Sequence, residues 1–160
     1  MYITCSRKSD VTSKRFSKYL SKLLPNIEYI PRGKGNLQKI FEKSRYLSNN
    51  YFLLCSNNKQ FLHLLIYKIS DGSYLPDRKY ILDVLDLRHS LSFKDIKKYN
   101  NVVNDLKKVF YFLDSSNISS KSEYGLYFLE NNVFEFRYLD KSIGVKFKIE
   151  NVIVFDWKYS

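Results

Sequence analysis

The sequence is poor in the residues that indicate a disulfide-stabilised, zinc-binding or membrane protein. Its 160 residues include only two cysteines and two histidines, and these do not have the spacing of a metal site. It contains no apolar run of about 18 residues and no apolar segment typical of a secretory signal. We therefore expect a soluble, cytoplasmic protein in which Cys5 and Cys55 are buried free thiols, with no metal, no cofactor and no membrane association.

Aromatic and basic residues are abundant by contrast. The 14 Tyr and 12 Phe, within a hydrophobic share of 44%, are enough to build a core. The 27 Lys and Arg outnumber the 16 Asp and Glu and give a formal net charge of +11. Residues 1–48 hold 11 of the basic residues and only three acids, so most of the excess charge lies in the first third of the chain. This asymmetry indicates a polyanionic partner.

The first third alternates short apolar segments with basic helices. The pattern predicts strands over 2–5 and 27–30, each followed by a helix. Asp10 or Thr12 can cap the first helix, and Asn36 can cap the second. Because a right-handed crossover makes the two strands parallel, both strand-to-helix junctions should lie at the same end of the sheet.

Each of these junctions carries basic residues. The first contains Arg7 and Lys8, and the second contains Arg32, Gly33 and Lys34. Helix starts favour anions, and glycine lets a backbone approach a ligand closely. The second junction matches neither a Walker A loop nor a dinucleotide-binding fingerprint. We predict a phosphate-binding edge with exposed Arg32 and Lys34 side chains, and an ordinary solvated turn is the alternative.

The first helix has a basic face as well as an apolar one. Its apolar positions recur at helical spacing and are Phe16, Tyr19, Leu20, Leu23 and Leu24. Lys14, Lys18 and Lys22 form a row at four-residue spacing, and Arg15 lies beside it. We predict that these four residues extend the nucleic-acid surface, although a solvated helix face has the same pattern.

The rest of the chain reads mainly as strands. One further helix is predicted over 93–112, followed by a Ser/Asn-rich loop over 114–122. A turn is predicted at 71–72, leading into a loop through 76–77. The predicted strands are 51–55, 60–69, 79–87 (where a helix is the alternative), 124–130, 133–139, 143–149 and 152–157.

No catalytic set is recognisable. His63 and His89 have no visible acid–base partner, and the acidic residues are dispersed. Asp83 and Asp86 are three residues apart, so on a regular strand they would face opposite ways. A small nuclease would need clustered acids or histidines, and we therefore predict that the protein is not an enzyme.

Several of these segments resemble Brix-domain ribosome-biogenesis proteins. The segment Thr4-Cys5-Ser6-Arg7-Lys8 and the segment Tyr29-Ile30-Pro31-Arg32-Gly33-Lys34 resemble the amino-terminal signature of that family. Residues 134–138 and 143–147 resemble its carboxyl-terminal strand and turn. The chain is most similar to short archaeal members related to the eukaryotic Imp4 group. It departs from the family pattern at Cys5, where Ser is usual, and at Ser9 and Val145, where Pro is usual.

The resemblance implies both a fold and a function. The implied fold is an α/β domain over 1–160 of mixed sheets with packed helices. Its two similar halves, near 1–75 and 76–160, would resemble the anticodon-binding domain of class IIa aminoacyl-tRNA synthetases. The implied function is non-catalytic binding of a ribosomal RNA precursor during subunit assembly, with ribosomal or assembly proteins as further partners and a monomeric state favoured. The alternative is a tRNA-binding module of the synthetase type.

Overall fold

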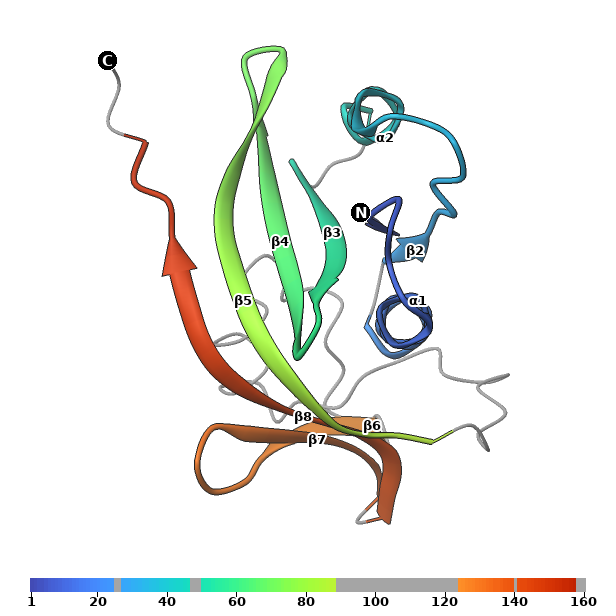
Figure 1. The fold of residues 1–160 in the computed structure, drawn as a ribbon, viewed down its shortest axis with the longest axis vertical. Coiled ribbons are helices and arrows are strands. Elements are labelled where there is room, and N and C mark those ends of the chain that lie inside the picture. The colour runs from blue at the N-terminus through green and yellow to red at the C-terminus, as the bar shows by residue number, and fades with distance from the viewer. Residues whose placement is uncertain (25–26, 47–49, 89–123, 140, 158–160) are drawn as a thin grey trace.

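The computed structural model describes residues 1–24, 27–46, 50–88, 124–139 and 141–157, and these form one curled eight-stranded sheet with two helices (Figure 1). The predicted helix over 93–112 and loop over 114–122 lie outside these residues. The strand order is β2-β1-β3-β4-β5-β8-β7-β6. The helices are α1 (Val11–Leu23) and α2 (Leu37–Ser44). The strands are β1 (Tyr2–Cys5), β2 (Glu28–Tyr29), β3 (Tyr51–Asn58), β4 (Phe61–Ser70), β5 (Ser73–Leu87), β6 (Tyr124–Phe128), β7 (Val133–Tyr138) and β8 (Lys141–Val154). The predicted mixed α/β class is confirmed.

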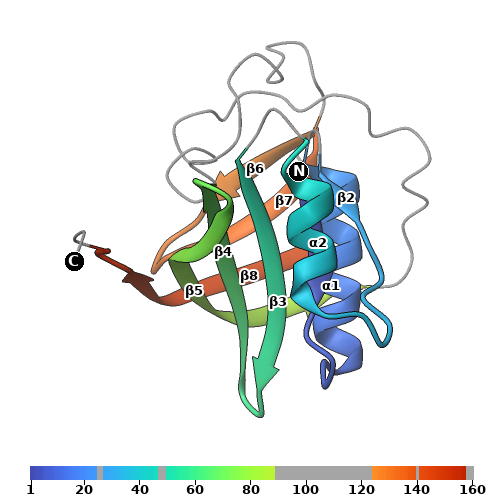
Figure 2. The ribbon, with the colours of Figure 1, turned by 90° about the horizontal axis from the view of Figure 1, so that it is seen from above.

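Strand β1 pairs in parallel with both of its neighbours. Tyr2 lies opposite Glu28 of β2 and opposite Phe52 of β3, and Cys5 lies opposite Cys55. All other strand pairs among the described residues are antiparallel. The carboxyl ends of β1 and β3 therefore lie at one end of the sheet, and Figure 2 shows the end of β3 beside the loops that enter α1 and α2. The predicted placement of the two junctions is confirmed.

Helix α1 packs into the concave side of the sheet. Asp10 caps it as expected, and its buried side includes Phe16, Leu20 and Leu23. The ring of Phe16 meets the ring of Phe147 on β8 edge-on, with centroids 5.7 Å apart. This contact joins the first helix to the carboxyl-terminal strands, because the sheet curls around α1 (Figure 1). The largest described core cluster is therefore shared by both ends of the chain.

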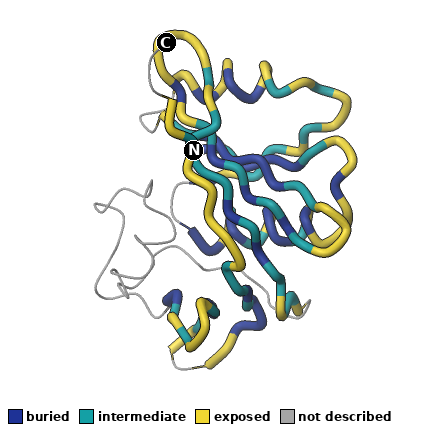
Figure 3. Tube along the Cα trace, turned by 60° about the vertical axis from the view of Figure 1, so that its left-hand side comes forward, coloured by how far each residue is buried: buried dark blue, intermediate teal, exposed yellow. Residues whose placement is uncertain are grey.

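Helix α2 covers the opposite face, where its Ile40 and Phe41 pack on Phe52 and Ile69 in a second cluster. Asn36 caps this helix, as predicted. Figure 3 shows buried residues running along the strands, while the turns are exposed. Neither described helix is long and apolar enough to cross a membrane.

Two sequence predictions about strand continuity are wrong. The turn at Asp71 and Gly72 is present, but β5 starts directly after it and passes through the predicted loop at Pro76 and Asp77. A bulge opposite Tyr67 accommodates this segment, since a bulge can tolerate proline, which has no N–H to donate. Similarly, the strands predicted over 143–149 and 152–157 are joined in one strand, β8, which ends at Val154.

A second bulge changes the orientation of two acidic residues. Asp83 lies opposite Lys148, and Asp86 lies opposite Lys146, with the register shifted between Val84 and Asp86. Residues two apart on β8 share a face, so both carboxylates lie on the same face of the sheet. The prediction that they face opposite ways is wrong because the extra residue in the bulge resets the alternation.

Gly72 and Gly144 both have left-handed backbone conformations, but only Gly144 is also crowded by a neighbouring side chain. Gly72 has φ +78°, and an added Cβ would meet nothing within 4 Å. Gly144 has φ +74°, and an added Cβ would lie 2.9 Å from Cβ of Arg88. We expect Gly72→Ala to cost roughly 1–2 kcal/mol of unfolding free energy. Gly144→Ala should cost about 1–3 kcal/mol more, because the clash is added.

Urea unfolding of both variants measures the difference. Equal losses in the two variants would show that β8 shifts away from Arg88 without cost.

Candidate nucleic-acid interface

The two strand-to-helix junctions touch each other. Arg7 Nη2 donates a hydrogen bond of 3.4 Å to the carbonyl oxygen of Lys34. At the base of the junctions, Thr4 Oγ1 donates to the carbonyl of Ile30 at 2.8 Å. The parallel pairing of β1 with β2 brings these segments together although they are about 27 residues apart in sequence. The predicted basic edge is thus contributed by adjacent loops.

The second junction is a closed loop in which Arg32 has a structural role. Its Nε donates to the carbonyl of Gly35 at 3.1 Å, and the Gly35 N–H donates to the carbonyl of Arg32 at 3.0 Å. Gly33, with φ +56°, lies in the left-handed conformation that this turn requires. Lys34 is exposed as predicted, but Arg32 is half-buried. Arg32 also lies near Tyr67, where it opposes the rise in the tyrosine pKa caused by burial and Tyr74.

The first junction is fixed by its backbone and presents its cations to solvent. The Ser6 N–H donates to the carbonyl of Cys55 at 2.8 Å, and the Ser9 N–H donates to the carbonyl of Ser6 at 3.2 Å. Between these anchored residues, Arg7 and Lys8 are both exposed. The exposed cations at the sheet edge are therefore Arg7, Lys8 and Lys34.

The helix starts contribute less to anion binding than the sequence suggests. Asp10 Oδ1 accepts a hydrogen bond of 2.7 Å from the Ser13 N–H at the start of α1. Its carboxylate already places a negative charge where a phosphate would sit. At α2, the neutral amide of Asn36 accepts from the Lys39 N–H at 3.3 Å. The basic side chains, rather than the α1 dipole, are left to attract an anion.

A polar pocket of about 220 Å³ lies beside the start of α1. Its lining includes Asp10, Ser13, Lys59 and Asp83. Two carboxylates oppose one ammonium group there, so the pocket is unsuited to phosphate. The cationic surface lies instead on the junction loops and the outer face of α1.

The outer face of α1 extends this surface away from the sheet edge. Lys14, Lys18 and Lys22 are exposed, as predicted, and span about 12 Å along the helix. The Lys18 ammonium lies 5.7 Å from the centre of the Tyr29 ring on β2, which holds it near the second junction strand. Arg15 is half-buried, so it presents less of its charge to solvent.

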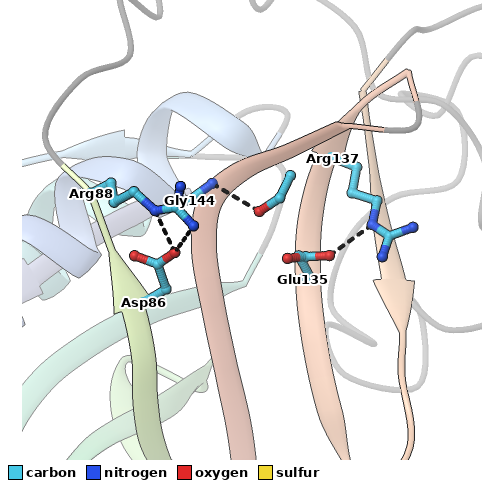
Figure 4. Close-up of polar contacts among 6 residues, drawn as sticks. Asp86, Arg88, Glu135, Arg137 and Gly144 are labelled. Atoms are coloured by element: carbon cyan, nitrogen blue, oxygen red, sulfur yellow. Dashed lines mark hydrogen bonds and ion pairs between the residues drawn. The ribbon is translucent and has the colours of Figure 1, made fainter.

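Sequence reasoning missed a further arginine beside α1. Tyr19 donates from its hydroxyl to the carbonyl of Arg88 at 2.6 Å, which joins the end of β5 to the helix. Arg88 forms a 2.7 Å ion pair with Asp86 (Figure 4), yet its side chain is 67% exposed. The Arg88 N–H donates to the carbonyl of Gly144 at 2.9 Å. The Asp-x-Arg spacing at 86–88 could have predicted the ion pair. No feature of the sequence predicts that Arg88 lies near α1.

A second arginine–carboxylate pair stabilises strand β7, which lies beyond β8 in the sheet. Arg137 Nε lies 2.7 Å from Glu135 Oε2 (Figure 4), and the guanidinium of Arg137 also stacks over the Tyr127 ring. Burial raises the pKa of Glu135, but the hydrogen bonds from Arg137 and Ser142 and the nearby cations outweigh it, so the net pKa is lowered. The ion pair therefore contributes stability while Glu135 is ionised.

The described residues contain no cluster suited to metal binding. No group of three or more His, Cys, Asp or Glu within the described ranges could hold a metal ion. His63 is half-buried on β4, where burial and then the charge of Lys79 lower its pKa. His89 lies outside the described residues.

Comparisons with known proteins agree on the fold. No family model and no curated protein sequence matches the chain. Among solved structures, the chain is similar to Mil, an archaeal Imp4-like protein, with 17% identity and a TM-score of 0.69 over 97% of this chain and all of that one. It is also similar to a probable ribosomal biogenesis protein from Aeropyrum pernix K1, with 12% identity and a TM-score of 0.60 over 96% and 98% of the two chains. The predicted resemblance to Imp4-like proteins is therefore confirmed at the level of the fold.

The Arg137–Glu135 pair gives a pH-dependent prediction. The folded-state pKa of Glu135 is lowered, so its contribution to stability is present above the unfolded value near 4.3 and is lost as pH falls through the folded value. Arg137→Met should cost about 1–3 kcal/mol at pH 7, because it leaves a buried carboxylate without its main partner. The difference from the wild type should shrink as pH falls below about 4, where the carboxyl is protonated.

Thermal unfolding from acidic to neutral pH measures this effect. Lys148→Met is the control, since it breaks the half-exposed Lys148–Glu150 pair and should change stability by less than about 1 kcal/mol. A deficit in Arg137→Met that stays constant across the pH range would mean that only the contact of Arg137 with Tyr127 matters.

Proposed function

We propose that this protein binds a ribosomal RNA precursor during ribosomal subunit assembly, in the cytoplasm and without catalysing a reaction. The contact between Arg7 and Lys34 carries the proposal, because it makes one continuous cationic edge from two loops. Likeness in fold to an archaeal Imp4-like protein and to a probable ribosomal biogenesis protein supports the choice of RNA over other polyanions.

The residues of the edge divide into two roles. Lys8 and Lys34 are exposed cations positioned to contact phosphates. Arg7 and Arg32 each donate a hydrogen bond to a backbone carbonyl of the second junction, so they shape the loop in addition to adding charge. A surface held in shape before binding loses less entropy when RNA binds.

The outer face of α1 provides the length of the interface. The Lys14, Lys18 and Lys22 row spans about 12 Å, with about 6 Å of helix between successive lysines. The row is therefore long enough for about three phosphates beyond those at the junctions. Such contacts position an RNA without reading its sequence.

A tRNA-binding module of the synthetase type remains the second candidate. It would use the same cationic edge, since phosphates of either RNA are recognised by the same side chains. The relative affinity for the two kinds of RNA distinguishes the candidates. A ribosome-assembly factor should bind fragments of ribosomal RNA precursor more tightly than bulk tRNA of similar length.

The first test reverses the two exposed charges. Lys8→Glu with Lys34→Glu should weaken binding to ribosomal RNA precursor fragments by at least about tenfold, because two phosphate contacts become repulsive. The slope of log affinity against log salt concentration should fall by roughly 1.5. Fluorescence anisotropy at several salt concentrations measures both quantities, and the melting temperature should stay almost unchanged because both side chains are exposed.

The matched control is Lys43→Glu with Lys68→Glu. These lysines are also exposed, but Lys43 is in the last turn of α2, and Lys68 pairs with Tyr51 at the other end of β3. Both double variants lose four units of charge. Equal weakening in the two would show that RNA responds to net charge and that no local site exists.

The second test concerns chemistry. Incubation of the protein with labelled precursor RNA should leave the RNA intact, and a divalent-metal chelator should not change the melting temperature, since neither a catalytic set nor a metal cluster is present within the described ranges. RNA cleavage that is lost in His63→Ala or Asp83→Asn would contradict the non-catalytic proposal.

A further inference from the structure

The two cysteines of the chain face each other on neighbouring strands. Cys5 on β1 and Cys55 on β3 are directly opposite in the parallel register, although 50 residues separate them in sequence. Side chains at paired positions point to the same face of a sheet, and both cysteines belong to the core cluster under α1. They are free thiols and the only cysteines in the sequence.

The surroundings make Cys5 the more reactive of the two. Its Sγ donates to the hydroxyl of Ser17 at 3.2 Å and lies 3.5 Å from the carbonyl of Ser13, both on α1. The neighbouring thiol of Cys55 is the largest influence on the pKa of Cys5 and lowers it, whereas burial raises the pKa of Cys55. Cys5 also retains 4% of its surface exposed, and Cys55 retains none. Both thiols are buried, and the lowered pKa of Cys5 makes it the first of the two to attack an oxidant.

We propose that Cys5 and Cys55 form an intramolecular thiol–disulfide site that is oxidised by peroxides. The Cys5 thiol gives up its proton, the thiolate attacks one oxygen of the peroxide, and the O–O bond breaks. Cys5 becomes a sulfenic acid, and the departing hydroxide takes up the thiol proton and leaves as water. The Cys55 sulfur then attacks the sulfenyl sulfur, the S–O bond breaks, and a second water leaves with the Cys55 proton. Two thiols and one hydrogen peroxide thus give one disulfide and two waters.

The backbone geometry is compatible with this bond. Adjacent strands lie about 4.7–4.9 Å apart, which falls within the Cα separations of about 4.4–6.8 Å found across disulfides. The bond would close a loop that contains α1, β2 and α2, so it would restrict the unfolded chain over nearly the whole first third. The bond would also link β1 to β3 at the residue before Ser6, whose N–H already donates a hydrogen bond to the Cys55 carbonyl.

The test uses the wild-type chain treated with dilute hydrogen peroxide, then denatured and alkylated. We expect a monomer in which neither cysteine is alkylated and in which the Cys5 and Cys55 peptides are linked, as seen by mass spectrometry. Dithiothreitol should restore both thiols. The oxidised protein should melt about 5 °C higher than the reduced protein, because a loop of this length gains substantially from closure.

Cys55→Ser provides the matched control, in which oxidation should stop at a Cys5 sulfenic acid that dimedone can trap, with no rise in melting temperature. Alkylation of both thiols after peroxide treatment, disulfides only between molecules, or over-oxidised Cys5 without the linked peptide in the wild type would each overturn the proposal. A lower melting temperature in the linked form would also overturn it, because it would show that the strands are distorted by the bond. The wild-type mapping decides the question even if the variant does not fold.

Discussion

The parallel pairing of β1 with both β2 and β3 is the constraint on which the rest of the structure depends. Each parallel neighbour must return to the same end of the sheet, so each requires a crossover, and here the crossovers contain α1 and α2. The helices then cover opposite faces, and their entry loops meet at one edge. The hydrogen bond from Arg7 to the Lys34 carbonyl is a direct result of this pairing.

At that edge, arginines that hydrogen-bond to the loop backbone alternate with lysines that are exposed to solvent. The guanidinium groups of Arg7 and Arg32 have several donors, so each can bond to a carbonyl and still retain charge for a ligand. The ammonium groups of Lys8 and Lys34 are exposed. The acidic cap at Asp10 lies on the α1 side of the first junction and adds one negative charge beside the cations of that junction.

The carboxyl-terminal strands reach the first helix because β5 and β8 are long and carry bulges. Their curvature lets Phe147 pack against Phe16, and it places the end of β5 where Tyr19 bonds to the Arg88 carbonyl. Gly144 makes room for Arg88 at the same point. Residues distant in sequence therefore surround α1, and the helix that bears the basic row is held from both ends of the chain.

The elements of the first third could be predicted from the sequence, because hydrophobic spacing, capping residues and glycine positions are local signals. The sequence therefore predicted α1 and α2 with their caps, the parallel strands, and the exposure of the basic row and of Lys34. Tertiary structure alone decided the continuity of β5 through Pro76, the shared face of Asp83 and Asp86, and the union of two predicted strands in β8. It also decided that Arg32 is half-buried and that Arg88 lies beside Tyr19. Bulges, register and burial arise from contacts between distant segments, and local residue patterns do not encode them.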